Sequence, residues 1–285
     1  MKLPDVLFNI NNLQTEAEHY ISEAGHLKKK ETMKQVLSCI DLTTLNSTDT
    51  VSHVAEFTQK VNAFESHFPE LPNVAAICVY PNMASTVFEN LAPGDVKIAA
   101  VAGGFPSSMT FDEIKIREAQ LAVINGADEI DIVLPLWAFL EENYDYCCRE
   151  ISAIKDAIGN AHLKIILETG VLPEAKSIWK ASILALQAGA DFIKTSTGKL
   201  PVSATPQAAI VMCHALKFWR ETTGEMRGFK PAGGISSTDD ALVYFAIVRD
   251  ILGEEWLSNK LFRIGASRLA NNLLSEITEK EIAYF

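Results

Sequence analysis

Eight short apolar segments alternate with eight longer segments of helical periodicity along most of this 285-residue chain. The short segments have the length and β-branched content of buried strands, and the longer ones repeat apolar residues at the spacing of amphipathic helices. We expect the strands at residues 36–41, 74–80, 96–101, 129–134, 163–168, 192–195, 228–231 and 261–264. We expect the helices at residues 50–66, 84–91, 111–125, 142–158, 174–188, 206–222, 238–252 and 267–281.

This alternation predicts an α/β protein built as a single (β/α)8 TIM barrel, in which eight parallel strands close inside a ring of helices. Residues 1–35 are polar and helical in pattern, which predicts an N-terminal helical extension, and residues 282–285 form a C-terminal tail. No linker or low-complexity segment divides the chain, so we expect one domain over residues 1–285. The rival architecture is a doubly wound open sheet, but no Gly-x-Gly-x-x-Gly opens a helix after the first strand.

A short internal repeat supports the barrel. Asn125-Gly126-Ala127-Asp128 and Ala188-Gly189-Ala190-Asp191 each end a predicted helix and open a predicted strand. The interval between them is two units of roughly 30 residues, the size of a strand and its following helix. Glycine suits the left-handed conformation that often ends a helix, so we expect it at both copies.

Charge and composition exclude several classes of function. The formal net charge of −11 disfavours general binding to nucleic acid or anionic membranes, although a cationic pocket could still hold a small anion. No stretch approaches the ~20 apolar residues of a membrane span, and the N-terminus lacks the features of a secretory signal, so we expect a cytoplasmic protein. The cysteines are odd in number and lack metal-ligand spacing, which predicts reduced thiols and no structural zinc; they are Cys39, Cys78, Cys147, Cys148 and Cys213.

Charged residues interrupt several of the apolar strands. They are Asp41, Asp131, Lys164, Glu168, Lys194 and Lys230, and Lys164 and Glu168 are expected on one face of the fifth strand. A charge in such a strand is costly unless it is paired, so one interpretation is a ring of ion pairs that fills the barrel centre. Two lysines on neighbouring strands fit that interpretation less well, because like charges placed together destabilise the fold unless they serve another purpose.

A nucleophilic amine is such a purpose. A free lysine is almost fully protonated at neutral pH, whereas Schiff-base formation needs the neutral amine. A neighbouring cation and apolar surroundings both lower the pKa of a lysine. Lys230 could act as that cation for Lys194, or Lys194 for Lys230, and Asp131 and Asp41 are available to move protons.

Glycine-rich turns follow the last three predicted strands. They are Thr197-Gly198-Lys199, Gly233-Gly234-Ile235-Ser236 and Gly265-Ala266-Ser267. Glycine lets backbone N–H groups approach an anion, and the helix that begins after each turn directs its positive end there. Barrels often hold phosphate at this place, so these turns predict a phosphate site.

Four segments resemble the motifs of the 2-deoxyribose-5-phosphate aldolase family. They are residues 39–45 (CIDLTTL), 129–135 (EIDIVLP), 192–199 (FIKTSTGK) and 228–234 (GFKPAGG), and the resemblance extends over residues 36–270. That family consists of class I aldolases on a (β/α)8 barrel, which need no metal or other cofactor. They cleave 2-deoxy-D-ribose 5-phosphate reversibly to acetaldehyde and D-glyceraldehyde 3-phosphate, so the expected partners are small phosphosugars and aldehydes.

The resemblance implies a role for each matching residue. Lys194 would form the Schiff base, Asp131 would act as acid and base, Lys230 would depress the pKa of Lys194, and Asp41 would complete a proton relay with Lys230. The residues implied near the substrate are Thr43, Leu45, Cys78 and Thr197. Those implied at the phosphate are Gly198, Lys199, Gly233, Gly234, Ser236, Gly265 and Ser267.

Three features depart from the family pattern or extend it. Ser236 stands where many members have arginine, and Arg268 stands where they have a second serine. Residues 102–108 differ from the Asn-Phe-Pro form of relatives. Some relatives end in a tyrosine that folds over the barrel mouth and moves a proton, and Tyr284, one residue before the end, is our candidate for that role.

Two other functions compete with the aldolase. The same barrel and phosphate turns could serve a metal-independent phosphosugar isomerase or epimerase, with Asp131 and Asp41 as acid and base. A catalytically silent phosphosugar-binding protein would keep the same residues. A homodimer is compatible with the sequence, which does not identify its interface.

Overall fold

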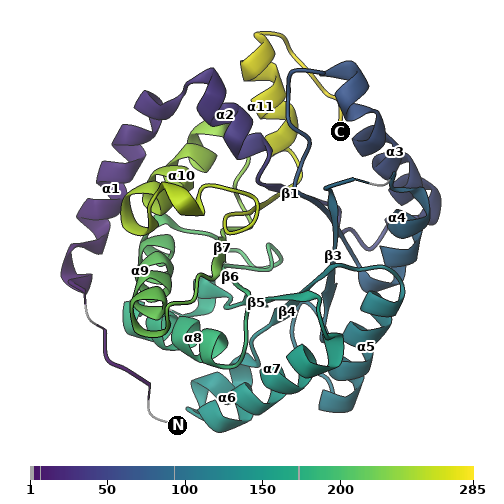
Figure 1. The fold of residues 1–285 in the computed structure, drawn as a ribbon. Coiled ribbons are helices and arrows are strands. Elements are labelled where there is room, and N and C mark those ends of the chain that lie inside the picture. The colour runs from purple at the N-terminus through teal and green to yellow at the C-terminus, as the bar shows by residue number, and fades with distance from the viewer. Residues whose placement is uncertain (1–2, 7, 93, 173) are drawn as a thin grey trace.

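The computed structural model describes residues 3–6, 8–92, 94–172 and 174–285. Within them, eight parallel strands form one sheet around a central axis, and helices surround it (Figure 1). Strands β1 to β7 pair in sequence order, and β1 also pairs with β8. Bridges Phe229–Phe262 and Ala232–Gly265 join the last two strands, so the sheet is nearly closed. This order confirms the (β/α)8 barrel and contradicts the doubly wound sheet.

The strands lie close to the predicted ones, apart from the first and the last. They are β1 Ile40–Thr43, β2 Ala76–Val79, β3 Lys97–Ala102, β4 Glu129–Val133, β5 His162–Ile166, β6 Phe192–Lys194, β7 Gly228–Lys230 and β8 Ile264–Ala266. Val36 and Leu37, expected in the first strand, end a helix instead, because a short buried apolar run is compatible with either structure. Leu261 lies in a turn closed by its bond to Ser258, so β8 begins three residues later than predicted.

All eight predicted barrel helices form, and several begin at a side-chain cap. They are α3 Val51–His67, α4 Ala84–Asn90, α5 Asp112–Ile124, α7 Tyr144–Ile158, α8 Ala175–Gln187, α9 Pro206–Thr223, α10 Thr238–Leu252 and α11 Leu269–Thr278. In four of them, the side chain just before the helix accepts an N–H group that the first turn leaves unpaired. These caps are Thr50 for α3, Asn143 for α7, Thr205 for α9 and Ser237 for α10. One short helix, α6 Leu136–Leu140, was not predicted.

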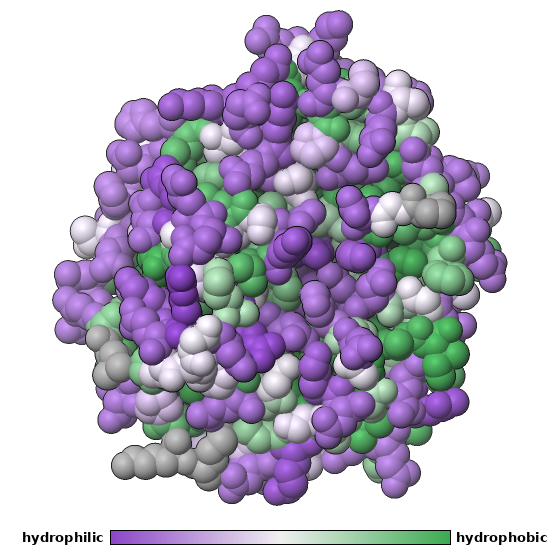
Figure 2. Space-filling view, viewed as in Figure 1, coloured by the Kyte–Doolittle hydropathy of each residue, from purple (hydrophilic) through white to green (hydrophobic). Residues whose placement is uncertain are grey.

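Two helices precede the barrel, as the polar lead-in predicts. α1 Leu13–Ala24 packs along α9 and α10 on the outside of the ring, and α2 Lys30–Leu37 packs against α10 and α11 (Figure 1). Figure 2 shows the molecule from the same side as Figure 1. Hydrophilic side chains cover most of the face seen there, and hydrophobic side chains form smaller patches. Among the described residues, no helix combines the length and the apolar character needed to cross a lipid bilayer.

The barrel interior differs from the apolar layer between strands and helices. Large buried aliphatic and aromatic side chains fill that outer layer. Inside the ring, a small apolar cluster covers only one part; its members are Leu45, Ala76, Cys78, Ala99 and Val101. On β4 to β7, the side chains of Asp131, Lys164, Lys194 and Lys230 are buried together and paired with each other. The interior is therefore divided into an apolar and a charged part.

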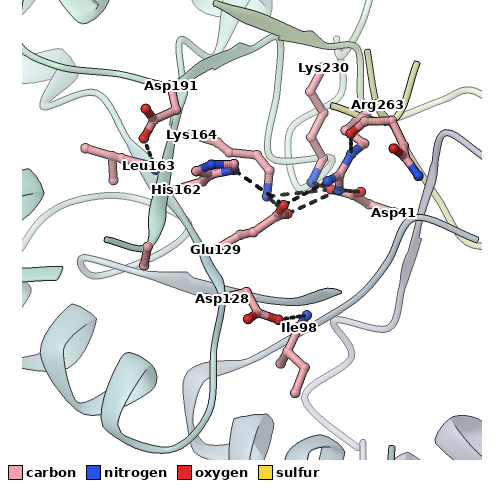
Figure 3. Close-up of polar contacts among 12 residues, drawn as sticks. Asp41, Ile98, Asp128, Glu129, His162, Leu163, Lys164, Asp191, Lys230 and Arg263 are labelled. Carbon is pink, nitrogen blue, oxygen red and sulfur yellow. Dashed lines mark hydrogen bonds and ion pairs between the residues drawn. The ribbon is translucent and has the colours of Figure 1, made fainter. Parts of the chain in front are cut away.

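The internal repeat has a structural function. Gly126 and Gly189 both adopt a φ of 101°, the positive value expected of them. Asp128 accepts the N–H of Ile98 at 2.9 Å, and Asp191 accepts the N–H of Leu163 at 2.8 Å (Figure 3). Each aspartate thus joins the start of its own strand to the start of the preceding one, and both copies help to set the register of the barrel.

Gly228, the first residue of β7, allows a close approach that a larger residue would prevent. A Cβ atom at Gly228 would lie 2.2 Å from the ring of Phe192 on β6. We expect Gly228→Ala to lower the free energy of unfolding by about 1–3 kcal/mol, because the buried ring has no room to move. Denaturant unfolding with an unchanged m-value measures this effect.

Gly25→Ala is the matched control. A Cβ there meets no atom within 4 Å, and the backbone is already helical. We expect this variant to be as stable as the parent chain or slightly more so, by up to about 1 kcal/mol. Equal losses of stability in both variants would contradict the packing argument.

Candidate active site

A cavity of about 280 Å³ opens where the carboxyl ends of β1, β6, β7 and β8 meet. In a (β/α)8 barrel this end carries the loops that bind substrates. Most residues that the sequence predicted for the substrate and the phosphate line this one cavity; they are Thr43, Leu45, Thr197, Gly198, Lys199, Gly233, Gly234, Ser236, Gly265 and Ser267. Cys78 is the exception, since it is fully buried within the apolar cluster on β2.

Lys194 forms part of the cavity wall and connects it to the charged interior. Only 4% of its side chain is exposed, and its Nζ donates to Oδ2 of Asp131 at 2.8 Å. Lys194 is the last residue of β6, and the two residues before it, Phe192 and Ile193, are buried apolar side chains that anchor the strand. The cavity therefore reaches one amine that is otherwise shielded from water.

Asp131 binds three lysines at once. Its Oδ2 accepts from Lys194 and Lys230, and its Oδ1 accepts from Lys164, each at 2.8 Å. The strand register explains this meeting, because Asp131 on β4 pairs with Lys164 on β5, and Lys194 on β6 pairs with Lys230 on β7. The carboxylate is held in one orientation on the axis of the barrel.

The two lysines on β6 and β7 differ in pKa. Burial lowers the pKa of Lys194, and the ammonium of Lys230 acts in the same direction, so the result is below the ordinary value despite the opposing effect of Asp131. Burial also acts to lower the pKa of Lys230, but Asp131 and Asp41 more than offset it and raise that pKa. Lys230 thus remains a cation, whereas Lys194 loses its proton more readily. This choice between the two lysines was open from the residues alone.

The carboxylates beside them remain ionised. Burial acts to raise the pKa of Asp131, but Lys164, Lys194 and Lys230 together hold it well below its ordinary value. The pKa of Asp41 is also lowered, because Lys230 and Arg263 outweigh the effect of its burial. Asp41 bonds to Lys230 through Oδ2 and to Arg263 through Oδ1, the latter at 2.6 Å.

The glycine turns have the geometry of an anion site. Gly198, Gly233 and Gly234 have φ values of 74°, 85° and 80°, which few other residues adopt. A Cβ at Gly233 would lie 3.0 Å from the Cα of Gly198, so the two turns pack directly on each other. α11 begins after Ser267 and Arg268 without a side-chain cap, and the positive end of its dipole lies beside the cavity.

The two departures from the family pattern meet in the same cavity. Ser236 and Arg268 both line it, so the turn after β8 brings a cationic residue to the cavity that has serine after the Gly233-Gly234 turn. Lys199 donates to the backbone oxygen of Leu45 and brings a second cation to the wall. The cavity therefore combines backbone N–H groups with two cationic side chains.

The prediction from sequence placed Glu168 wrongly and did not single out Arg263. Glu168 lies beyond β5, in a left-handed conformation with φ of 53°, and its carboxylate accepts the hydroxyl and N–H of Thr197 at 2.5 and 3.2 Å. It therefore does not share a strand face with Lys164 as expected. Arg263 was not singled out, although it is a charge within the predicted eighth strand and the criterion used for the other strands would have found it.

The C-terminal tail does not lie over the barrel mouth. The Tyr284 hydroxyl donates to the backbone oxygen of Lys60 at 2.7 Å, and its ring packs on Phe64 of α3 and on Phe68, which follows that helix. Asn271 on α11 accepts the N–H groups of Tyr284 and Phe285, which fastens the tail beside α3 (Figure 1). Contacts with an aromatic surface on the outside of the ring thus position Tyr284, contrary to the expectation that it reaches the site.

No group of three or more His, Cys, Asp or Glu side chains within the described part of the chain is placed to hold a metal ion. No disulfide joins any of the five cysteines, all of which lie in the described part of the chain.

Comparisons with known proteins identify the family of this chain. A family model described as DeoC/LacD family aldolase matches residues 35–250. A deoxyribose-phosphate aldolase from Bos taurus is 41% identical over 256 residues, which cover 85% of this chain and 80% of the relative. The deoxyribose-phosphate aldolase from Homo sapiens is 38% identical, with coverage of 94% and 90%. A tetrameric deoxyribose phosphate aldolase from Aeropyrum pernix superposes with a TM-score of 0.66 at 25% identity, covering 91% of this chain and 97% of that one.

Replacing Lys230 by Met should raise the pKa of Lys194. The change removes a neighbouring cation and leaves Asp131 with fewer partners, and both effects favour the ammonium form of Lys194. Lys194 would then need a higher pH to react, with about tenfold less neutral amine for each unit of the rise. The pH dependence of its acylation by acetic anhydride, mapped by peptide mass spectrometry, measures the shift.

Lys155→Met is the matched control, because Lys155 is also paired, with Asp191 at 2.6 Å, but outside the barrel interior. Its loss should leave the acylation midpoint of Lys194 unchanged. If Lys230→Met also left that midpoint in place, Lys230 would not act on Lys194 through its charge.

Proposed function

The chain belongs to the DeoC/LacD aldolase family and is an aldolase, a carbon–carbon lyase, and from this premise we propose its substrate and mechanism. The substrate is 2-deoxy-D-ribose 5-phosphate, cleaved reversibly to acetaldehyde and D-glyceraldehyde 3-phosphate in the breakdown of deoxyribose phosphates. The observation that carries this proposal is the buried Lys194 amine on the cavity wall. It lies 2.8 Å from Asp131, which also binds the ammonium group of Lys230.

The reaction begins at the neutral amine of Lys194. Its nitrogen adds to the C1 aldehyde of the open-chain sugar, and loss of water leaves an iminium ion that withdraws electrons from C2. The C3 hydroxyl then loses its proton, the C2–C3 bond breaks, and its electron pair forms an enamine while C3 becomes the aldehyde of glyceraldehyde 3-phosphate. Protonation of C2 and hydrolysis of the iminium release acetaldehyde and restore Lys194.

Asp131 is suited to assist the proton transfers of this cycle. It is ionised at rest and contacts the Lys194 nitrogen directly, so it can accept a proton from the adding amine and return it to the departing hydroxyl. Lys230 and Asp41, which bond to each other, complete the path by which a proton leaves Asp131. Lys230 also supplies the positive charge that favours the neutral form of Lys194.

The phosphate binds at the other side of the cavity. Backbone N–H groups of the turns at Gly198 and Gly233, together with the start of α11, provide donors, and Lys199 and Arg268 provide charge. Thr197 lies between the phosphate turns and Lys194, with its hydroxyl oriented by Glu168, and is placed to contact the sugar.

The isomerase and the silent binding protein fit this geometry less well. An isomerase needs a carboxylate free to remove a proton from carbon, but both oxygens of Asp131 are occupied by ammonium groups. A binding protein has no need for an amine whose pKa is lowered. Steady turnover of deoxyribose phosphate excludes the binding protein, and trapping of an imine excludes the isomerase.

We further propose that residues 1–285 act as one catalytic domain in the cytoplasm, without a metal or organic cofactor, and that the chain assembles as a homodimer. The related enzyme from Aeropyrum pernix is a tetramer, so light scattering of this protein distinguishes the two assemblies.

Sodium borohydride added with 2-deoxyribose 5-phosphate should reduce the imine and leave a stable adduct on Lys194. Lys194 is the lysine on which low exposure, a lowered pKa and an opening to the cavity coincide. Peptide mass mapping identifies the modified residue, and Lys194→Met should abolish both the adduct and turnover. An adduct on Lys230 with Lys194 unmodified would contradict the assignment.

Lys199→Met should raise KM for deoxyribose 5-phosphate by about tenfold and change kcat much less, because phosphate binding is equally strong in the ground and transition states. Lys217→Met, on an exposed part of α9, is the control and should alter neither constant. An unchanged KM in Lys199→Met would place the phosphate elsewhere.

A further inference from the structure

The ion pairs at Asp131 continue into a larger network toward the amino ends of the strands. Glu129, one pleat below Asp131 on β4, accepts from Lys164 at 2.6 Å and from Arg263 at 2.8 Å. Arg263 also binds Asp41, which in turn binds Lys230. Figure 3 shows Glu129 between Lys164 and His162 on one side and Arg263 and Asp41 on the other.

Seven charged side chains make up this network, which we call the buried charge cluster. They are Asp41, Glu129, Asp131, Lys164, Lys194, Lys230 and Arg263. None has more than 5% of its side chain exposed. Water therefore screens these charges very little, and any net charge in the cluster is energetically costly.

Six of the seven groups have pKa values shifted toward their charged forms. The neighbouring cations lower the pKa of Asp41, Glu129 and Asp131 in spite of burial. The neighbouring carboxylates raise the pKa of Lys164, Lys230 and Arg263, again against the effect of burial. These six groups carry three negative and three positive charges, so the cluster is balanced without any contribution from Lys194.

We propose that Glu129, Lys164 and Arg263 are positioning residues that keep Lys194 as a neutral amine, because the buried charge cluster is electrically neutral only when Lys194 carries no proton. The three residues lie below the cavity and act through Asp131 and Asp41 rather than on the substrate. This inference rests on the proposed function, in which the neutral Lys194 is the nucleophile.

Other titratable groups near Lys194 and Glu129 lie outside the ion pairs of the buried charge cluster. Burial raises the pKa of the Cys78 thiol, which stays uncharged. Glu168 and Lys199, at the cavity, bond to Thr197 and to the backbone of Leu45. At the opposite end, the His162 ring is 53% exposed and lies 3.8 Å from Glu129.

Two substitutions of opposite sign test the proposal. Glu129→Gln removes a negative charge, so a protonated Lys194 becomes less favourable and its pKa falls. Arg263→Gln removes a positive charge, so a protonated Lys194 restores neutrality and its pKa rises. We expect the acylation midpoint of Lys194 to move by about one pH unit in each direction, and to return near the parent value in the double variant.

The measurement is the pH dependence of Lys194 acylation by acetic anhydride, repeated in a His162→Gln background that removes the imidazole beside Glu129. If Arg263→Gln does not fold, Lys164→Gln is used in its place, because it also removes one positive charge from the cluster. The controls are Arg220→Gln and Glu255→Gln, which break an ion pair of 2.6 Å that is 43% and 49% exposed on the outside of the ring. Both controls should leave the midpoint unchanged.

Shifts of opposite sign support the proposal, because general destabilisation would not raise the midpoint in one variant and lower it in the other. Midpoints that stay in place, or move in the same direction, would overturn it. Borohydride trapping with deoxyribose 5-phosphate separates this failure from that of the proposed function. A substrate adduct on Lys194 with unmoved midpoints refutes only the charge balance, whereas no adduct at any pH refutes the Schiff-base mechanism.

Discussion

The carboxylate of Asp131, which accepts hydrogen bonds from Lys164, Lys194 and Lys230, is the interaction on which the centre of this barrel depends. It joins β4 to β5, β6 and β7 on the inside of the sheet, where an unpaired charge would be prohibitively costly. Removing one partner from a buried ion pair typically costs about 3–5 kcal/mol, so every member constrains the others. The network continues through Asp41, Arg263 and Glu129, and it leaves only a small apolar cluster near β2 and β3 to fill the rest of the interior.

The same arrangement connects stability to chemistry. A lysine surrounded by water would be protonated at neutral pH, and a lysine beside one buried carboxylate would be protonated even more firmly. Lys194 escapes both conditions because Asp131 is already neutralised by Lys164 and Lys230, and because burial disfavours another positive charge. The cavity then exposes this amine at one wall and offers cations and backbone N–H groups at the other. In the proposed reaction, the carbonyl would meet the first wall and the substrate phosphate the second.

Much of this could be predicted from the sequence, and the failures have identifiable causes. The βα alternation predicted the barrel, and the motifs around Lys194 and Lys230 predicted residues that the fold brings together. The first strand was placed too early because Val36 and Leu37 are buried apolar residues, and burial in a helix or a strand leaves the same pattern. Arg263 was missed because the charge inside the predicted eighth strand was not counted with those of the other strands, although its partners, Asp41 and Glu129, lie 222 and 134 residues away just as other members have distant partners. Tyr284 was misplaced because the aromatic residues in and just after α3 that hold it do not resemble a binding site in one dimension.

The sequence by itself determined the architecture and the chemical groups, because periodicity, glycine turns and charges inside apolar strands are local properties of the chain. It also determined that two lysines would meet near two aspartates. The residues alone left open which lysine stays protonated, and only the family resemblance favoured Lys194 as the nucleophile. The tertiary structure supplies the physical reason, because the pKa depends on how many carboxylates surround each amine and on how far water is excluded. It likewise decided that Arg268 takes a place in the cavity beside Ser236, and that the tail lies against α3. These outcomes depend on distances between residues far apart in the chain, which only the folded barrel fixes.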